Sequence, residues 1–428
     1  MMKLVSFSDR GFKTTVQRLC NRSQLASPAI EASVKRILQA VQRTGDRAVA
    51  RYTLQYDRAN LKPTTFRISK DQIKEAYYHI RKDEGDTLRH VEKRIRAFHE
   101  RQTPNTMMYQ EDGIKLGRMS VPLDSVGLYV PGGKAIYPSS ALMNAIPAKV
   151  AGVKRVVMCT PSRKGEISPY LLVAADIAGV DELYRIGGVQ AIGAMAYGTK
   201  MLPKVDKVVG PGNLYVATAK RLVFGHVGID SIAGPSELLI IADANANAEY
   251  IAADLLCEAE HDEAATVVLL TPSTTLANTV IRHVEKQLKS LSRRTIATRA
   301  VNRHGAVIVV RDMDHAIELG NLIAPEHMGL HVATPFELIE EIHHTGVVFL
   351  GEQTPPAIGD YVAGPNHVLP TGGTARFSSG LSVQDFTKWV NFVSYGKGDV
   401  SRAKDHVVRM ASMEGLTAHA RCVEVRTR

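Results

Sequence analysis

Short runs of apolar, mostly β-branched residues alternate with longer amphipathic stretches through the middle of the chain. One set of runs precedes residue 236 and a second set follows it; they lie at 126–130, 153–158, 183–186, 205–209, 237–242, 266–270 and 306–310. Stretches of helical periodicity separate them, for example 139–152, 168–179 and 189–199. This alternation is typical of βαβ units that build parallel, doubly wound sheets. Because the pattern restarts near residue 237, it predicts two similar α/β units in tandem.

The two ends of the chain follow other patterns. Apolar residues at helical spacing predict a helix over 28–43, and a long charged helical region runs from Asp71 to just before Pro104. Residues 107–120 alternate around a central Asp-Gly pair, which predicts a β-hairpin. The last ~50 residues lose the α/β alternation. A helical stretch at 403–413 there indicates a small separate arm.

Composition places the chain among ordinary globular proteins. With 428 residues, 45% of them apolar, it can form two or three packed units without cross-links. The formal net charge is +10, but the most charged stretch, 81–101, mixes both signs. Mixed signs are typical of a solvated helix face, whereas nucleic-acid-binding faces cluster Lys and Arg. We therefore expect no nucleic-acid partner, and the excess charge would instead attract anionic ligands such as a dinucleotide.

Cysteine spacing and hydropathy indicate a cytoplasmic location. The cysteines form no CxxC motif and no disulfide framework, since they lie far apart at Cys20, Cys159, Cys257 and Cys422. The first residues contain no apolar core of a signal peptide. No stretch of about 18 consecutive apolar residues occurs, so we expect no transmembrane helix and no membrane partner.

Two short motifs carry groups suited to metal and proton chemistry. Glu258 and His261 lie three residues apart in a helical stretch, so both can face one metal ion. On spacing alone, an acidic helix end with a solvated histidine explains this pair better. Glu326 and His327 are adjacent in a turn before a strand-like stretch. A carboxylate beside an imidazole can supply a water-activating group and a general base, or it can merely cap the turn.

Glycine-rich turns and one long loop are the remaining candidates. Three turns each follow an expected strand and precede an expected helix: Gly132-Gly133-Lys134, Gly187-Gly188 and Gly210-Pro211-Gly212-Asn213. That placement suits phosphate binding at helix N-termini. The chain has no G-x-G-x-x-G motif, so a standard Rossmann site is not predicted. Residues 359–373 form a turn-rich stretch that holds Asp360 and His367; it is either functional or an ordinary long loop.

Taken together and in order, these segments resemble the histidinol dehydrogenase family. The resemblance covers nearly the whole chain, from the stretch 127–133 to the tail 414–419. Its most specific pieces are 209–221, 259–262, 324–327 and 359–373. Each piece is weak alone, and the resemblance rests on their joint order and spacing.

The resemblance implies a four-electron alcohol oxidation. L-histidinol would be oxidised through an enzyme-held aldehyde, L-histidinal, to L-histidine with two NAD+, the last steps of histidine biosynthesis. His327 would take the alcohol proton as general base, and Glu326 would activate the water that hydrates the aldehyde. The family's NAD-contacting positions correspond to Tyr129, Gln190 and Asn213.

The resemblance also implies one zinc ion per subunit. The ligand positions correspond to Glu258, His261, Asp360 and His419. Histidines and carboxylates together form a set suited to zinc. The same four residues would contact the substrate, together with Ser236, His327 and Glu414. Of these, Glu414 would lie near the substrate's ammonium group.

For the fold, the resemblance implies an α/β protein with two incomplete Rossmann-like, doubly wound domains, which accounts for the missing fingerprint. A discontinuous first domain would comprise 24–128 and 237–379, and a second domain 129–236. An N-terminal arm at 1–23 and a C-terminal arm domain at 380–428 would flank them. The arms would exchange in an intertwined homodimer, so that Glu414 and His419 reach the partner's site.

Glu258 departs from the family pattern, which usually has Gln at this position. A carboxylate still offers an oxygen ligand, so zinc binding would tighten, while the added negative charge would lower the ion's Lewis acidity. This departure leaves a second reading open: a paralogous NAD-dependent zinc dehydrogenase that oxidises another small primary alcohol to an acid. Gly329, where an acidic residue is common, and Val189, in place of a usual Ala, are smaller departures.

Overall fold

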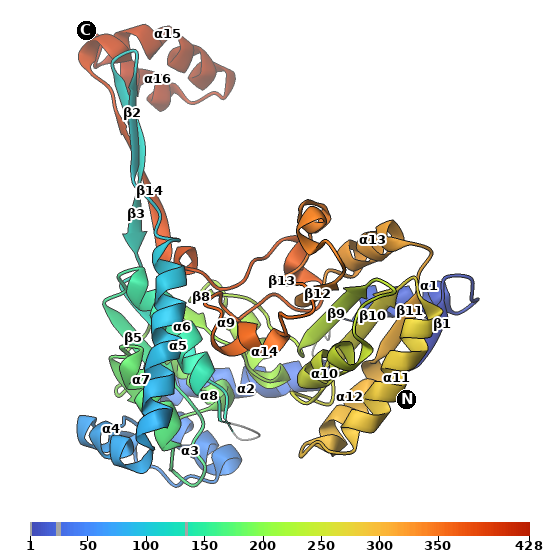
Figure 1. Cartoon of the computed structure of the whole chain (residues 1–428). Helices are drawn as coiled ribbons and strands as arrows, with labels where there is room; N and C mark the ends of the chain where they lie inside the picture. The colour runs from blue at the N-terminus through green and yellow to red at the C-terminus, as the bar shows by residue number, and fades with distance from the viewer. Residues whose placement is uncertain (1, 23–26, 133–135) are drawn as a thin grey trace.

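The computed structural model describes residues 2–22, 27–132 and 136–428. Two units with parallel sheets stand side by side, and a narrow arm projects from one of them (Figure 1). The expected domain boundary at 23/24 and part of the first glycine turn, Gly133-Lys134, lie outside the described residues. The α/β class with parallel sheets is thus as the sequence predicts.

A six-stranded parallel sheet forms one unit, with strand order β1-β11-β10-β9-β12-β13. Its strands are β1 (Lys3–Ser6), β9 (Glu237–Ala242), β10 (Thr266–Thr271), β11 (Ala306–Val309), β12 (His327–His331) and β13 (Val347–Leu350). One face is covered by α10 (Ala248–Ala259), α11 (Thr274–Leu288) and α12 (Arg294–His304), and the other by α1 (Phe12–Cys20) and α13 (Met313–Ile323). Leu238 and Ile240 of β9 face the first group, whereas Leu239 and Ile241 face the second. Burial on both faces explains why these strands read as unbroken apolar runs.

A five-stranded parallel sheet forms the other unit, with order β6-β5-β4-β7-β8. Its strands are β4 (Ser125–Tyr129), β5 (Arg155–Cys159), β6 (Glu182–Tyr184), β7 (Lys207–Val209) and β8 (Gly228–Ile229). On one face lie α4 (Lys70–Ala76), α5 (Lys82–Glu100), α6 (Pro138–Val150) and α7 (Pro169–Ile177). On the other lie α2 (Pro28–Thr44), α3 (Asp46–Asp57), α8 (Gly188–Tyr197) and α9 (Leu214–Val223).

The division into units differs from the expected one at the N-terminal side. Residues 27–128 were expected with the six-stranded unit, but their helices pack on the five-stranded unit, and 125–129 forms its central strand. The packing is close because Gly193 has no side chain: a Cβ there would lie 3.2 Å from Leu38 and 3.3 Å from Val41 of α2. The segment expected as an N-terminal arm instead supplies β1, an edge strand paired with β11.

The long charged helical region is two helices rather than one. Here α4 ends at Ala76, a 3-10 turn follows, and α5 begins at Lys82. A new start is favoured because the Glu84 carboxylate accepts a hydrogen bond of 2.8 Å from the Arg81 backbone N–H. Charges on α5 pair within the helix, as between Arg96 and Glu92 at 2.5 Å, which agrees with a solvated mixed face. Within the described residues, the 3-10 helices are η1 (Pro63–Thr65), η2 (Tyr77–His79), η3 (Pro335–Glu337), η4 (Ile339–Glu341), η5 (Thr374–Arg376) and η6 (Val383–Phe386).

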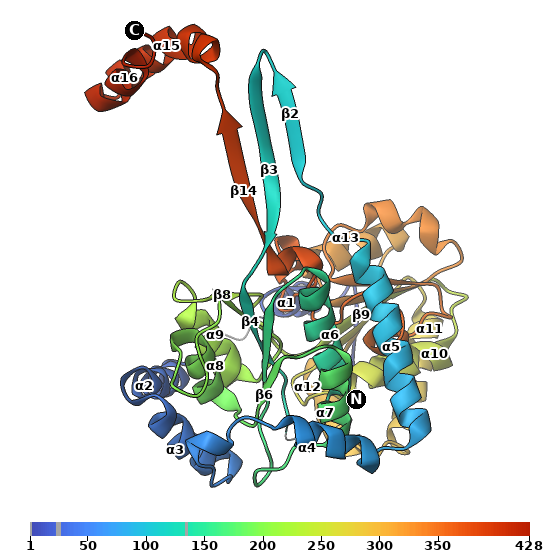
Figure 2. The same cartoon turned by 90° about the vertical axis from the view of Figure 1, so that its left-hand side faces the viewer.

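The arm is a three-stranded antiparallel sheet that carries two helices at its tip (Figures 1 and 2). It comprises β2 (Met107–Glu111), β3 (Ile114–Pro122), β14 (Thr387–Ser394), α15 (Lys397–Met413) and α16 (Thr417–Glu424). The predicted hairpin is confirmed: Asp112 and Gly113 join β2 to β3 with φ of 49° and 88°, the positive values that a tight Asp-Gly turn requires.

The four cysteines are free, and none of the helices in the described part of the chain is long and apolar enough to cross a membrane. A cytoplasmic location stays a prediction.

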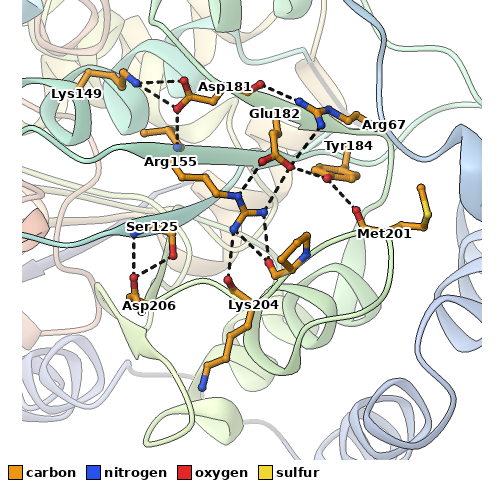
Figure 3. A network of polar contacts seen from close by, with 12 residues as sticks. Arg67, Ser125, Lys149, Arg155, Asp181, Glu182, Tyr184, Met201, Lys204 and Asp206 are labelled. Atoms are coloured by element: carbon orange, nitrogen blue, oxygen red, sulfur yellow. Dashed lines mark hydrogen bonds and ion pairs between the residues drawn. The ribbon is translucent and has the colours of Figure 1, made fainter.

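The candidate residues of the sequence analysis lie at opposite edges of the two sheets. In the five-stranded sheet, Tyr129 and the turns at Gly187 and Gly210 follow the carboxyl ends of the strands. The amino ends of these strands hold a separate polar network in which Arg155 binds Glu182 and Ser125 binds Asp206 (Figure 3). In the six-stranded sheet, Glu237 and His327 instead stand at the amino ends of β9 and β12.

Candidate active site

A buried cluster joins the two motifs that the sequence singled out. Ligand atoms of Glu258, Glu326 and His327 all lie within 4.8 Å of one another. His327 Nδ1 is 3.6 Å from Glu258 Oε2 and 3.7 Å from Glu326 Oε2. His261 Nδ1 lies 3.1 Å from Glu258 Oε1, and Ser236 donates a hydrogen bond to the same carboxylate. Residues far apart in sequence therefore meet: the Glu258 carboxylate lies between the rings of His261 and His327, and the Glu326 carboxylate lies beside His327.

The end of α10 and the turn between α13 and β12 place these side chains in the cluster. Helix α10 begins at the Asn247 cap, whose side chain accepts a hydrogen bond of 2.9 Å from the Glu249 backbone N–H, and its last turn carries Glu258. Helix α13 ends at Ala324 in the left-handed conformation (φ 50°, ψ 66°). Pro325 follows and cannot continue a helix. The chain therefore turns sharply into β12, and Glu326 and His327 start that strand inside the protein.

Glu237 holds both residues of the adjacent pair, and sequence reasoning missed it. Its backbone N–H donates to Glu326 Oε2 at 3.0 Å, while its own Oε2 accepts the Glu326 backbone N–H at 3.2 Å. Its carbonyl oxygen lies 2.9 Å from His327 Nδ1. Because a carbonyl can only accept, Nδ1 carries the proton of this contact, and Nε2 is the ring nitrogen left for proton transfer. The signal in the sequence is an acidic residue at the start of an otherwise apolar strand.

An aromatic ring and a glycine bring α14 (Pro356–Tyr361) next to the cluster. The His327 ring stacks on Phe349, with centroids 5.9 Å apart and planes at 14°. A Cβ at Gly359 would lie 2.5 Å from the Phe349 ring, so only glycine lets α14 lie this close. The next residue, Asp360, is near enough for its charge to raise the pKa of both Glu326 and His261.

His367 fixes the loop that follows α14. This residue is half-buried, and removal of its ring from water lowers its pKa. Nδ1 lies 3.1 Å from the Asp360 carbonyl oxygen, and Nε2 lies 3.4 Å from Ser140 Oγ of α6. The turn-rich stretch is therefore an ordered connection between the site and the five-stranded unit.

The environment shifts the pKa values of the two carboxyl groups of the cluster in opposite directions. Burial raises the pKa of Glu326 well above its ordinary value, and the negative charges of Glu258 and Glu237 raise it further. Burial also acts to raise the pKa of Glu258, but the charge of His327 and the hydrogen bond to His261 outweigh it and leave that pKa lowered. The same hydrogen bond raises the pKa of His261 to about 9. Glu326 is thus suited to accept a proton, and Glu258 to stay ionised.

This donor set fits a zinc ion. Buried imidazole nitrogens and carboxylate oxygens within a few ångströms of one another are the ligands that zinc takes in catalytic sites. Of the residues expected to bind metal, the structure brings together Glu258 and His261, with Asp360 beside them. Glu414 and His419 are exposed and belong to the helical tip of the arm, which lies away from α10 in both views and from α14 in Figure 1 (Figures 1 and 2).

The expected NAD positions gather at the carboxyl edge of the five-stranded sheet. The buried Tyr129 hydroxyl accepts a hydrogen bond of 3.0 Å from the Gly188 backbone N–H. Gln190 is fully buried, and neither atom of its amide has a partner among the described residues. Orphaned buried amides are rare, so this one indicates a ligand. Asn213 has a structural task as well, because its side chain caps α9.

Comparisons with known proteins agree over the full length. A model of the histidinol dehydrogenase family matches residues 20–427. The histidinol dehydrogenase of Bacillus anthracis is 49% identical over 414 residues, covering 96% of either chain, and that of Syntrophotalea carbinolica is 47% identical over 427 residues, covering 100% of this chain and 99% of the relative. The crystal structure of histidinol dehydrogenase from Elizabethkingia anophelis superposes with a TM-score of 0.94 at 35% identity, covering 99% of this chain and 98% of that one.

Proposed function

The chain belongs to the histidinol dehydrogenase family, an NAD-dependent oxidoreductase family whose members oxidise histidinol to histidine, and we propose that the buried Glu258–Glu326–His327 cluster is where this chain carries out that reaction. Each L-histidinol consumes two NAD+ and one water and yields L-histidine as the carboxylate, two NADH and three protons. L-histidinal, the intermediate, stays on the enzyme. The observation that carries the proposal is the cluster itself, in which an imidazole held through its Nδ1 and a carboxyl of raised pKa meet inside the protein.

His327 is the general base of both oxidations. Its Nδ1–H is held by the Glu237 carbonyl, which leaves Nε2 free to take a proton. In the first step this proton comes from the alcohol as hydride leaves for NAD+. In the second it comes from the hydrated aldehyde. Stacking on Phe349 keeps the ring in one orientation through both steps.

Glu326 activates the water that hydrates the aldehyde. A carboxylate that removes a proton from water works best when its pKa is raised toward neutrality. Burial beside Glu258 and Glu237 provides that shift. Its Oε2 is held by the Glu237 backbone N–H.

Glu258, His261 and Asp360 would hold zinc, with His419 supplied by a second copy of the chain. The contact of 3.1 Å between His261 and the buried Glu258 carboxylate, together with the nearby charge of Asp360, supports this assignment. When bound, the ion polarises the substrate's alcohol and carbonyl oxygen as a Lewis acid. Ser236, already bonded to Glu258, would contact the substrate together with these ligands, and Glu414 would pair with its ammonium group.

Tyr129, Gln190 and Asn213 would bind NAD+ beside the glycine turns. The unpartnered Gln190 amide supports this, as does the N-terminus of α8, which offers backbone N–H groups to phosphate oxygens.

Exchange of arms in a homodimer would complete each site. The arm sheet has no core of its own, since every residue of β2 is exposed. Its large exposed apolar side chains include Met108, Trp389 and Val393. Such a projection normally packs against a partner. Glu414 and His419 on the arm would then reach the partner's cluster.

The activity test follows NADH formation on L-histidinol with zinc-loaded protein. We expect two NADH per histidinol and no release of aldehyde. Folded, metallated protein that does not turn over would reject the proposal. A panel of other small primary alcohols serves as control, and a much higher kcat/KM on an alcohol without imidazole would favour the paralogous dehydrogenase.

Arm exchange is tested by mixing two inactive variants. His419→Ala removes a ligand from the arm, and Glu326→Gln removes the water-activating group from the body. After joint unfolding and refolding, half of the dimers are mixed, and each has one site with both groups intact. We expect activity to return to about a quarter of the wild-type level if the arm acts on its partner. No recovery, with mixed dimers present by mass spectrometry, would show that the arm does not act in this way.

A further inference from the structure

We propose that Arg22 and Glu237 form a buried positioning pair that sets the orientation of Glu326 and His327. Neither side chain is assigned to substrate, metal or NAD+. The inference rests on the proposed roles of Glu326 and His327 and extends them to the residues behind them. It concerns the end of the first helix, a segment that the sequence leaves without any functional signal.

The Arg22 guanidinium is completely satisfied. It binds the Glu237 carboxylate in bidentate fashion, with Nε 2.6 Å from Oε1 and Nη2 2.6 Å from Oε2. Nη1 donates to the carbonyl oxygens of Leu19 at 2.6 Å and Ile323 at 2.8 Å. Nη2 also donates to Ala324 at 3.0 Å. All five N–H groups thus have acceptors, and only 9% of the side chain is exposed.

The Glu237 carboxylate is equally occupied. Besides Arg22, its Oε1 accepts the Gly372 backbone N–H at 2.9 Å, and its Oε2 accepts the Glu326 backbone N–H at 3.2 Å. Two charged groups with every donor and acceptor in use have one low-energy arrangement. The pair therefore joins four segments at one point: the end of α1, the start of β9, the α13–β12 turn and the loop at Gly372.

Those segments carry the reacting groups. Arg22 holds the carbonyls of Ile323 and Ala324, three and two residues before Glu326. Glu237 holds the Glu326 main chain through its carboxylate, and it holds the Glu326 carboxylate and the His327 ring through its own main chain. Without Arg22, the Glu237 carboxylate would be a buried charge without its partner and would have to move or take up a proton. Either change releases Glu326 and His327 from their fixed directions.

The test compares both half-reactions in Arg22→Met, Arg22→Lys and Glu237→Gln. Because the pair positions Glu326 and His327 together, kcat should fall for L-histidinol and for supplied L-histidinal. We expect a loss of about tenfold to a hundredfold in Arg22→Met, with the KM for each substrate changed less than about threefold. Arg22→Lys retains the charge but cannot make both bonds, so its loss should be smaller. Rates are referred to the folded fraction, measured well below each variant's Tm.

The matched control is Arg155→Met. Arg155 also binds a glutamate through two nitrogens, with Nε 2.8 Å and Nη2 3.4 Å from the Glu182 carboxylate, and it also holds backbone carbonyls (Figure 3). This network lies at the amino ends of the five-stranded sheet, outside the proposed site. We expect Arg155→Met to lower Tm while leaving kcat per folded molecule within about twofold of wild type.

A spectroscopic readout separates positioning from stability. In metal-free, histidine-labelled protein, the His327 ring should give the 15N shifts of a single Nδ1–H tautomer, identified by its absence in His327→Asn. Arg22→Met should shift that signal toward a mixture of tautomers, and Arg155→Met should not. Should Arg22→Met fail to fold, Arg22→Lys and Glu237→Gln decide by the same comparison.

The outcomes are distinct. Equal kcat loss per folded molecule in Arg22→Met and Arg155→Met, or normal kcat with an unchanged His327 signal in Arg22→Met, would overturn the positioning role. Failure of the proposed function has another signature, because the wild-type protein itself would then be inactive on L-histidinol.

Discussion

Replacing Asp57 by Asn should change the pH dependence of stability in a direction that the structure dictates. Asp57 is the half-buried last residue of α3, and its carboxylate accepts a hydrogen bond from the Gly187 backbone N–H. Burial raises its pKa from 3.8 to about 6, although that hydrogen bond opposes the shift. Asn offers an acceptor oxygen of the same size without the charge. The substitution therefore removes the titration and keeps the contact.

The sign follows from where the proton is bound. Between pH 4 and 6 the folded chain holds a proton on Asp57 that the unfolded chain has lost, so folding stability falls as pH rises through this window. Between pH 5 and 7.5 the linkage relation gives a loss of about 1.4 kcal/mol for these two pKa values. Partial solvent screening reduces this to about 1 kcal/mol. Asp57→Asn does not suffer this loss. Its free energy of unfolding relative to the wild type should therefore rise by about 1 kcal/mol from pH 5 to pH 7.5.

The assay is urea unfolding of metal-free wild type and Asp57→Asn at pH 5 and 7.5. Metal is left out because its binding is itself pH-dependent. Asp71→Asn serves as control, since that side chain is 94% exposed, and its stability difference from wild type should be the same at both pH values. If Asp57→Asn shows no relative gain at pH 7.5, or a loss, burial of an ionised carboxylate is not what destabilises the turn at Gly187.

Four further substitutions test the site. Glu326→Gln should slow histidinal oxidation far more than histidinol oxidation, while His327→Asn should slow both; equal losses in the two half-reactions of Glu326→Gln would refute its role in activating water. Glu258→Gln removes a buried negative charge from the donor set, so zinc should pass to a competing chelator at a roughly tenfold lower chelator concentration; unchanged retention in a zinc-release assay would exclude Glu258 as a ligand. Gly359→Ala places a methyl group 2.5 Å from Phe349 and should cost about 1–3 kcal/mol in urea unfolding as well as most of kcat; full activity would mean that α14 can shift freely.

Much of the fold was predictable because it depends on local pattern. The doubly covered strands are unbroken apolar runs such as 237–242, and the arm hairpin is marked by its Asp-Gly turn. The candidate motifs were also visible, and the structure brings Glu258 and His261 next to Glu326 and His327.

What could not be predicted depends on contacts between distant segments. Periodicity shows that residues 28–43 form a helix, but the helices on which it packs, α8 and α9, lie far away in sequence, where Gly193 allows a close approach. The short run at 3–6 becomes a strand only because β11 offers a free edge. Arg22 and Glu237 have ordinary neighbours in sequence, and their importance comes only from the four segments that meet at them.

The proposed sites lie at the carboxyl edge of one sheet and at the amino edge of the other, and this difference determines the charge of the ligand that each site favours. In a parallel βαβ unit, helix N-termini lie at the carboxyl edge of the sheet and helix C-termini at the amino edge. At the five-stranded sheet the residues of interest therefore face the N-termini of α8 and α9, where partial positive charge attracts the phosphates of a dinucleotide. At the six-stranded sheet they stand at the C-terminus of α10, where partial negative charge favours a cation. The same building unit, approached from its two ends, thus offers positive helix ends to the proposed NAD+ site and a negative helix end to the proposed zinc site.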